Sequence, residues 1–206
     1  MPYSSAIANE IDTAASALQQ LKEGNFRFIN NMAINRDQLN LVDETKDEQK
    51  PYAVILSCMD SRISSEIIFD QGIGDIFSIR IAGNVISNGI LGSLEYATAV
   101  AGAKLIVVLG HTNCGAIRGA CDGVQMEHVS YVLQKIRPAI MMENTIRENR
   151  TGKNPEFVKA VTKLNVECSI TEIMQRSNTI SGLVESGEVA MVAGMYDVAT
   201  GRVVFH

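Results

Sequence analysis

Residues 52–62, YAVILSCMDSR, and residues 104–115, KLIVVLGHTNCG, decide the fold of this chain. In each stretch a short apolar run is followed directly by polar and sulfur-containing residues. Such runs are typical of strands that are buried on both faces of a parallel sheet. Because functional groups gather at the carboxyl ends of strands in open α/β sheets, we expect Cys58, Asp60, Arg62, His111 and Cys114 to meet at one edge.

These residue types predict a zinc enzyme. Cys58, His111 and Cys114 offer two thiolates and an imidazole, which are ligands that zinc prefers, and a catalytic zinc keeps a fourth position for water or substrate. Asp60 has two possible roles: it could bind the metal and close the site, or it could accept a hydrogen bond from a metal-bound water. Arg62 offers a bidentate partner that would hold the carboxylate of Asp60 away from the metal.

The rest of the chain predicts an α/β fold with a mostly parallel central β-sheet, flanking helices, extra N-terminal helices and a C-terminal strand pair. Strands are expected at 52–57, 75–81, 104–109, 188–196 and 202–205, and helices at 64–71, 88–101, 115–121, 125–149, 155–176 and 180–186. The length of 206 residues is compatible with one α/β domain that spans the whole chain.

The first 34 residues are expected to form a helical arm. Apolar residues recur at helical spacing from Ile7 to Leu21, and Gly24 is interpreted as the stop of this helix. A second short helix is expected at 25–31. The polar segment 35–50, with its charge run from residue 43, is interpreted as a solvated loop.

Composition excludes several classes of partner. The chain carries 18 basic and 23 acidic residues, a net charge of -5, without a basic stretch, so neither nucleic acid nor an anionic membrane is an expected partner. It contains no signal-like N-terminal segment and no apolar stretch near the roughly 18 residues of a membrane helix. We therefore expect a cytoplasmic protein whose thiols serve metal or catalysis, with Cys121 and Cys168 as packing residues.

The motifs Cys58-x-Asp60-x-Arg62 and His111-x-x-Cys114-Gly115 resemble the signature of the β-class carbonic anhydrases, zinc enzymes that interconvert carbon dioxide and bicarbonate. The resemblance extends over most of the chain. Similar blocks are LKEGNFRF (21–28), SEIIFD (65–70), Arg80, AGNV (82–85), SLEYA (93–97), VVLGH (107–111) and GMYD (194–197).

The resemblance implies a substrate pocket for carbon dioxide. Gln49, Phe77 and Tyr96 fall where the family has a glutamine, a phenylalanine and a tyrosine, and Ala82 falls where many members have valine. The backbone N–H of Gly115 is free to approach the same substrate. The implied mechanism is attack of zinc hydroxide on carbon dioxide, with Asp60 and Arg62 as catalytic residues.

The resemblance also implies a homodimer or a homotetramer, with pocket residues contributed across the interface. One branch of the family has a closed form whose inhibitory pocket uses a tryptophan and lacks the glutamine. Because this chain has no tryptophan and does have Gln49, we expect the open type of site. Since two thiolates reduce the charge of the metal, we expect an activity midpoint on the alkaline side of neutrality.

Two other functions remain open at this point. The first is a related zinc hydrolase that acts on carbonyl sulfide or carbon disulfide with the same ligands. The second is a noncatalytic zinc-binding or bicarbonate-sensing protein, whose structural metal site would be closed by four strong ligands.

Overall fold

A computed structural model describes residues 11–206 of the chain. The start of the expected N-terminal helix, from Ile7, lies outside the described residues. Five strands form one sheet in the order β2-β1-β3-β4-β5. Their bounds are Ala53–Ser57 for β1, Ile76–Arg80 for β2, Leu105–His111 for β3, Ala190–Tyr196 for β4 and Val203–Phe205 for β5. The first four are parallel and β5 is antiparallel to β4, which confirms the expected fold class.

Strands β1 and β3 are buried along their whole length because they lie between two apolar layers. Ala53 and Ile55 belong to one hydrophobic cluster, whereas Val54 and Leu56 belong to the other. Successive side chains of a strand point to opposite faces of the sheet. A continuous apolar run is therefore what a central strand of this sheet requires.

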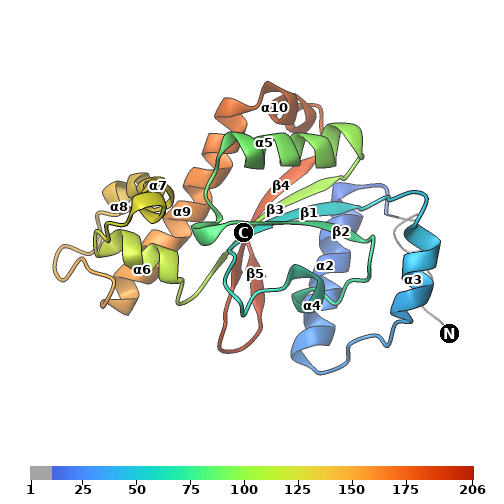
Figure 1. Cartoon of the computed structure of the whole chain (residues 1–206), viewed down its shortest axis with the longest axis horizontal. Coiled ribbons are helices and arrows are strands. Elements are labelled where there is room, and N and C mark those ends of the chain that lie inside the picture. The colour runs from blue at the N-terminus through green and yellow to red at the C-terminus, as the bar shows by residue number, and fades with distance from the viewer. Residues whose placement is uncertain (1–10) are drawn as a thin grey trace.

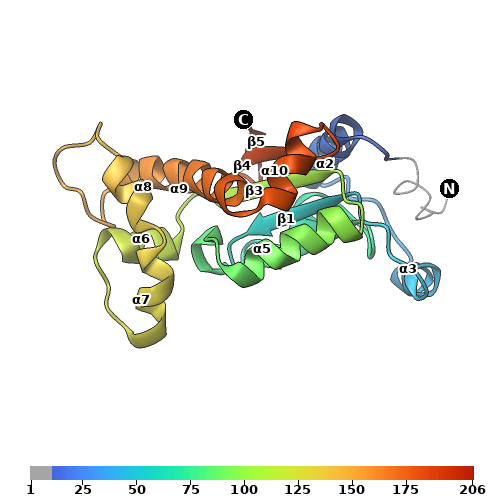
Figure 2. The same ribbon diagram turned by 90° about the horizontal axis from the view of Figure 1, so that it is seen from above.

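Helices cover both faces of the sheet (Figure 1). Helices α2 (Ala14–Ile29) and α4 (Ser65–Ile68) pack on one face, and α5 (Asn88–Glu95) and α10 (Asn178–Glu185) pack on the other. The long helix α9 (Pro155–Arg176) contacts β3 and β4. Helices α6 (Gly115–Cys121), α7 (Glu127–Gln134) and α8 (Arg137–Met142) project beyond the sheet (Figure 2). Among the described helices, none is both long enough and apolar enough to cross a membrane.

The sequence suggested that Gly24 ends the first helix, and this prediction is wrong. Helix α2 continues to Ile29, so the expected second helix is the end of the first. A β-carbon at Gly24 would lie 1.7 Å from the carbonyl oxygen of Phe69, the residue that caps α4. The glycine therefore permits close contact between α2 and α4, and it is not a stop signal.

Three other expected boundaries differ in the structure. The segment 35–50 contains a helix, α3 (Gln38–Thr45), and the last part of the expected helix 88–101 is a π-helical turn, η2 (Tyr96–Val100). The expected helix 125–149 is divided into α7 and α8, and residues 143–149 are not helical. Pro138 lies in the first turn of α8, where its missing N–H costs nothing, and it cannot continue α7.

Candidate metal centre

The structure brings together the three ligands that the sequence suggests. Cys58 directly follows β1, His111 is the last residue of β3, and Cys114 caps the amino end of α6. Because β1 and β3 are neighbouring parallel strands, with Ser57 opposite Leu109, their carboxyl ends meet. The ligand atoms of these three residues all lie within 4.8 Å of one another, and each residue is buried.

The donor set fits a zinc ion. The sulfur atoms of Cys58 and Cys114 are 4.0 Å apart. Two thiolates bound to one tetrahedral zinc, each at about 2.3 Å, would be about 3.8 Å apart. The Nε2 atom of His111 is buried and has no hydrogen-bond partner among the described residues. Such an orphaned nitrogen is costly, and a metal would satisfy it.

The backbone decides which nitrogen of His111 faces the cluster. Its Nδ1 lies 2.9 Å from the carbonyl oxygen of Thr112. A carbonyl can only accept a hydrogen bond, so Nδ1 carries the proton and Nε2 presents its lone pair. A hydrogen bond of this kind fixes both the tautomer and the orientation of a metal-binding histidine.

The two cysteines share a hydrogen bond, which shifts their pKa values in opposite directions. The thiol of Cys114 lowers the pKa of Cys58, and the backbone N–H of Gly83, 3.3 Å from the sulfur, lowers it further. The same pairing raises the pKa of Cys114. Metal binding requires both sulfur atoms to be deprotonated, so a metal would displace the protons that the pair shares.

Asp60 is held by Arg62 beside this cluster. The Nε and Nη2 atoms of Arg62 donate to the two carboxylate oxygens at 2.8 and 2.7 Å, and the backbone N–H of Arg62 donates at 3.0 Å. These hydrogen bonds hold the pKa of Asp60 well below its usual range. Nη2 of Arg62 also donates to the carbonyl oxygen of Asn113, which ties the pair to the loop between His111 and Cys114.

Arg80 is a residue of this centre to which the sequence analysis assigned no role. It ends β2, directly opposite Ser57 of β1. Its Nη2 donates to the carbonyl oxygen of Asp60 at 2.7 Å, and its Nε donates to that of Cys58 at 3.3 Å. Arg80 thus holds the backbone of the loop that carries both side chains. The sequence signal is its position at the end of the strand next to β1.

The residues expected in the substrate pocket lie in two places. Gly83, next to Ala82, contacts the sulfur of Cys58, and Gly115 begins α6 directly after Cys114, with open space where a β-carbon would stand. Ala82 and Gly115, two of the expected pocket residues, are therefore next to the cluster of Cys58, His111 and Cys114. Gln49 is exposed and precedes β1, so the whole strand separates it from Cys58.

Phe77 and Tyr96 are also separated from the cluster of the same chain. Phe77 pairs with Val54, four residues before Cys58, which corresponds to about 13 Å along a strand. The rings of Phe77 and Tyr96 meet edge to face with their centres 6.3 Å apart. Together with Gly89 and Gly92 they line a cavity of about 340 Å³.

Comparison with known proteins identifies the family. Residues 53–203 match the protein family described as "Carbonic anhydrase". The chain is 37% identical over 197 residues to carbonic anhydrase 2 of Mycobacterium tuberculosis, an alignment that covers 92% of this chain and 91% of the relative. It is 34% identical over 209 residues to the carbonic anhydrase of Mycolicibacterium smegmatis, with 98% and 94% covered.

A solved structure shows the same fold. One of two tetrameric β-carbonic anhydrases from Sordaria macrospora superimposes with a TM-score of 0.71, covering 93% of this chain and 94% of that one at 23% identity. The match of family, relatives and fold agrees with the motifs around Cys58 and His111. The chain therefore belongs to the β-class carbonic anhydrases, and it is an enzyme of the lyase class.

Proposed function

We propose that this chain catalyses the zinc-dependent, reversible hydration of carbon dioxide to bicarbonate and a proton. The observation that carries the proposal is the buried cluster of Cys58, His111 and Cys114 beside a carboxylate that Arg62 holds. When bound, zinc supplies a Lewis acid that allows a water molecule to ionise near neutral pH. The names of the relatives support the same reaction.

The protein side chains have distinct tasks in this proposal. Cys58, His111 and Cys114 hold the metal, and the carbonyl of Thr112 keeps His111 in the tautomer that exposes Nε2. Asp60 stays ionised at working pH because Arg62 stabilises its charge, so its carboxylate can accept a hydrogen bond and orient the attacking water. Because Arg62 holds its carboxylate, Asp60 does not bind the metal in this proposal. The fourth metal position is then free for water or substrate, as in the open type of site.

We also propose that two copies of the chain complete each other's pockets, within a homodimer or a homotetramer. Gln49, Phe77 and Tyr96 are separated from the candidate metal ligands of their own chain. Tyr96 is also 50% exposed to solvent. A partner copy would bring these side chains to the cluster, where their apolar surface suits carbon dioxide. We also propose a cytoplasmic location, where Cys58 and Cys114 would stay reduced and able to hold a metal.

The proposal is tested by stopped-flow hydration of carbon dioxide near pH 8, on protein of known zinc content. We expect fast hydration that requires zinc and rises with pH around a midpoint above 7. Asp60→Asn should lower the rate by about 100-fold or more, the size of a lost acid-base or orienting group. Asp43→Asn removes an exposed carboxylate of α3 and serves as the matched control.

Fully zinc-loaded protein without hydration activity would contradict the proposal. Activity with carbonyl sulfide or carbon disulfide would then identify a hydrolase. Inactivity with all three substrates would identify a noncatalytic zinc protein.

A further inference from the structure

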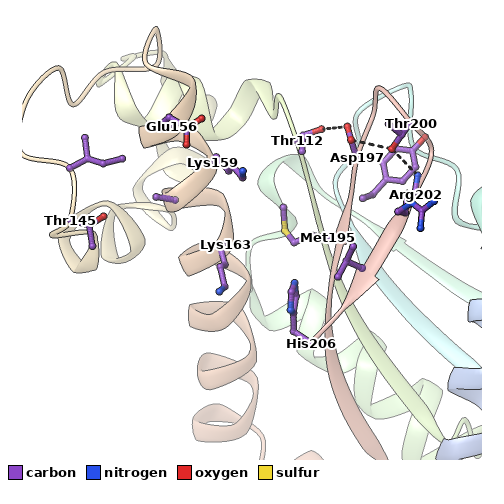
Figure 3. Close-up of a pocket in the computed structure, with 14 residues that line it drawn as sticks. Thr112, Thr145, Glu156, Lys159, Lys163, Met195, Asp197, Thr200, Arg202 and His206 are labelled. Carbon is purple, nitrogen blue, oxygen red and sulfur yellow. Dashed lines mark hydrogen bonds between the residues drawn. The ribbon is translucent and has the colours of Figure 1, made fainter.

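A second cavity, of about 610 Å³, lies between helix α9 and the strand pair β4 and β5 (Figure 3). Its volume is within the range of small-molecule sites in proteins. None of the three candidate metal ligands lines it, but Thr112, the neighbour of His111, does, so the cavity adjoins the candidate metal centre without containing its ligands.

Basic side chains line both walls of this cavity. Lys159 and Lys163 are one helical turn apart on α9, so they lie on the same side of the helix. Arg202 and His206 flank β5, with Val204 midway between them in the strand, and this even spacing places all three on the same side. Figure 3 shows Lys159, Lys163 and His206 directed into the space between the helix and the strands.

The cations of the cavity lack acidic partners. Within residues 11–206, Lys159, Lys163 and Arg202 form no ion pair with a carboxylate. Like charges four residues apart on a helix repel each other, which a bound anion would relieve.

The two acidic side chains that line the cavity do not balance its three permanent positive charges. Asp197 accepts hydrogen bonds from the backbone N–H of Ala199 and the hydroxyl of Thr200 in its own turn, and from the hydroxyl of Thr112, which follows β3. Glu156, in the first turn of α9, is the other carboxylate of the lining. Three permanent cations therefore stand against two carboxylates, one of which is already hydrogen-bonded.

The rest of the lining combines apolar side chains with the hydroxyl-bearing residues Thr112, Thr145, Tyr196 and Thr200. Met195 of β4 contributes its side chain between the two basic walls, and the other apolar residues of the lining are Ile146, Ala160 and Val204. From this combination we propose that the cavity binds a small organic anion, with its carboxylate, sulfonate or phosphate group between Lys159, Lys163 and His206 and its apolar body against Met195.

The proposal is tested with 8-anilinonaphthalene-1-sulfonate, an aromatic sulfonate whose fluorescence rises in apolar surroundings. We expect saturable binding that weakens with added salt, because the charges around this open cavity are screened. The double variant Lys159→Met and Lys163→Met keeps most of the side-chain length and removes the charge. It should weaken binding by roughly five-fold, as expected for the loss of two exposed charge contacts.

Two further variants keep the test decisive. Lys153→Met removes an exposed lysine just before α9, outside the cavity, and should bind the probe like the wild type. Ala160→Phe fills the space and should abolish binding, while circular dichroism confirms that each variant is folded. Equal affinity in the wild type, the double-methionine variant and Ala160→Phe would overturn the proposal. A wild-type protein that bound no probe would also overturn it.

Discussion

At the level of single residues, the metal centre depends on backbone carbonyls as much as on side chains. The carbonyl of Thr112 orients His111, and the carbonyls of Cys58 and Asp60 both accept hydrogen bonds from Arg80. Groups that hold metal ligands in place are part of a site even when they do not contact the metal. Arg80 is therefore a positioning residue for the loop that carries Cys58 and Asp60.

Replacing Arg80 tests this role. Arg80→Met removes both hydrogen bonds to the loop, so we expect zinc retention and kcat to fall by about ten-fold or more. The measurements are zinc content after dialysis against a chelator, and carbon dioxide hydration of the zinc-loaded protein. Arg80→Lys should restore part of both values. Arg147→Met removes an exposed arginine and is the control; if Arg80→Met behaved like this control, the role would be rejected.

Glu143 links stability to pH. Its buried carboxylate accepts hydrogen bonds from the hydroxyl and backbone N–H of Thr145, the N–H of Ile146 and Arg150, and these lower its pKa to about 2. A lowered pKa stabilises the folded state above the unfolded pKa of about 4.3, and this contribution is lost as the pH falls toward 2.

Urea unfolding at several pH values measures this contribution. Glu143→Gln should lower the free energy of unfolding at pH 7, and its difference from the wild type should shrink between pH 4.5 and 2.5. Glu148→Gln changes an exposed carboxylate of the same segment and is the control. A difference that stayed constant with pH would show that Glu143 acts through packing alone.

At the level of elements, the central strands could be predicted because their environment is simple. β1 and β3 are buried on both faces, so their apolar runs and the polar residues after them are visible in the sequence. The same logic predicted the meeting of Cys58, His111 and Cys114. The role of Arg80 could not be predicted, because it depends on which strand lies beside β1 and in which register.

Helix boundaries were harder to predict, because they depend on contacts that are distant in sequence. Gly24 resembles a stop signal, yet it lies inside α2 because the carbonyl of Phe69 approaches it. Pro138 indicated a division between α7 and α8, but the apolar periodicity continues on both sides of this proline and favoured a single helix. In both cases a local pattern was compatible with two structures, and packing selected one.

The contact at Gly24 can be measured by adding a single methyl group. Gly24→Ala would place its β-carbon against the backbone of Phe69, so α2 must shift, and we expect a loss of about 1 to 3 kcal/mol in the free energy of unfolding. Gly182→Ala makes the same change in α10, where no atom lies within 4 Å. It should stabilise the protein by up to about 1 kcal/mol. Equal effects in urea titrations would contradict the close contact.

At the level of the whole molecule, one sheet supports two apolar layers. The two hydrophobic clusters share β1 and β3, whose alternate side chains belong to one or the other. Helix α2 contributes Ala17 and Leu21 to one of these clusters, and the single domain with an N-terminal helical arm stays a prediction. Phe77 and Tyr96, which were expected in the substrate pocket, contact each other but lie apart from the candidate metal ligands of the same chain.

A charge placed at Gly92 tests whether a second copy completes the site. Gly92 lies on α5 and lines the same cavity as Tyr96 and Phe77. Within residues 11–206, no atom outside its neighbours and its own helix backbone is within 4 Å of where its β-carbon would be. Gly92→Arg should therefore leave the isolated chain folded and obstruct a partner at this face. We expect light scattering to show a smaller assembly, and kcat/KM for carbon dioxide to fall by about ten-fold or more as the pocket loses its alignment.

Gly182→Arg is the matched control for this change, because Gly182 is equally open but lies on α10, outside that cavity. It should keep both the mass and the activity of the wild type. A wild-type protein that is a stable monomer with full activity would contradict the shared pocket. A Gly92→Arg variant with unchanged mass would place the interface on another face. Loss of assembly together with loss of activity would mean that catalysis requires side chains from two copies, since the chain by itself keeps Phe77 and Tyr96 away from Cys58.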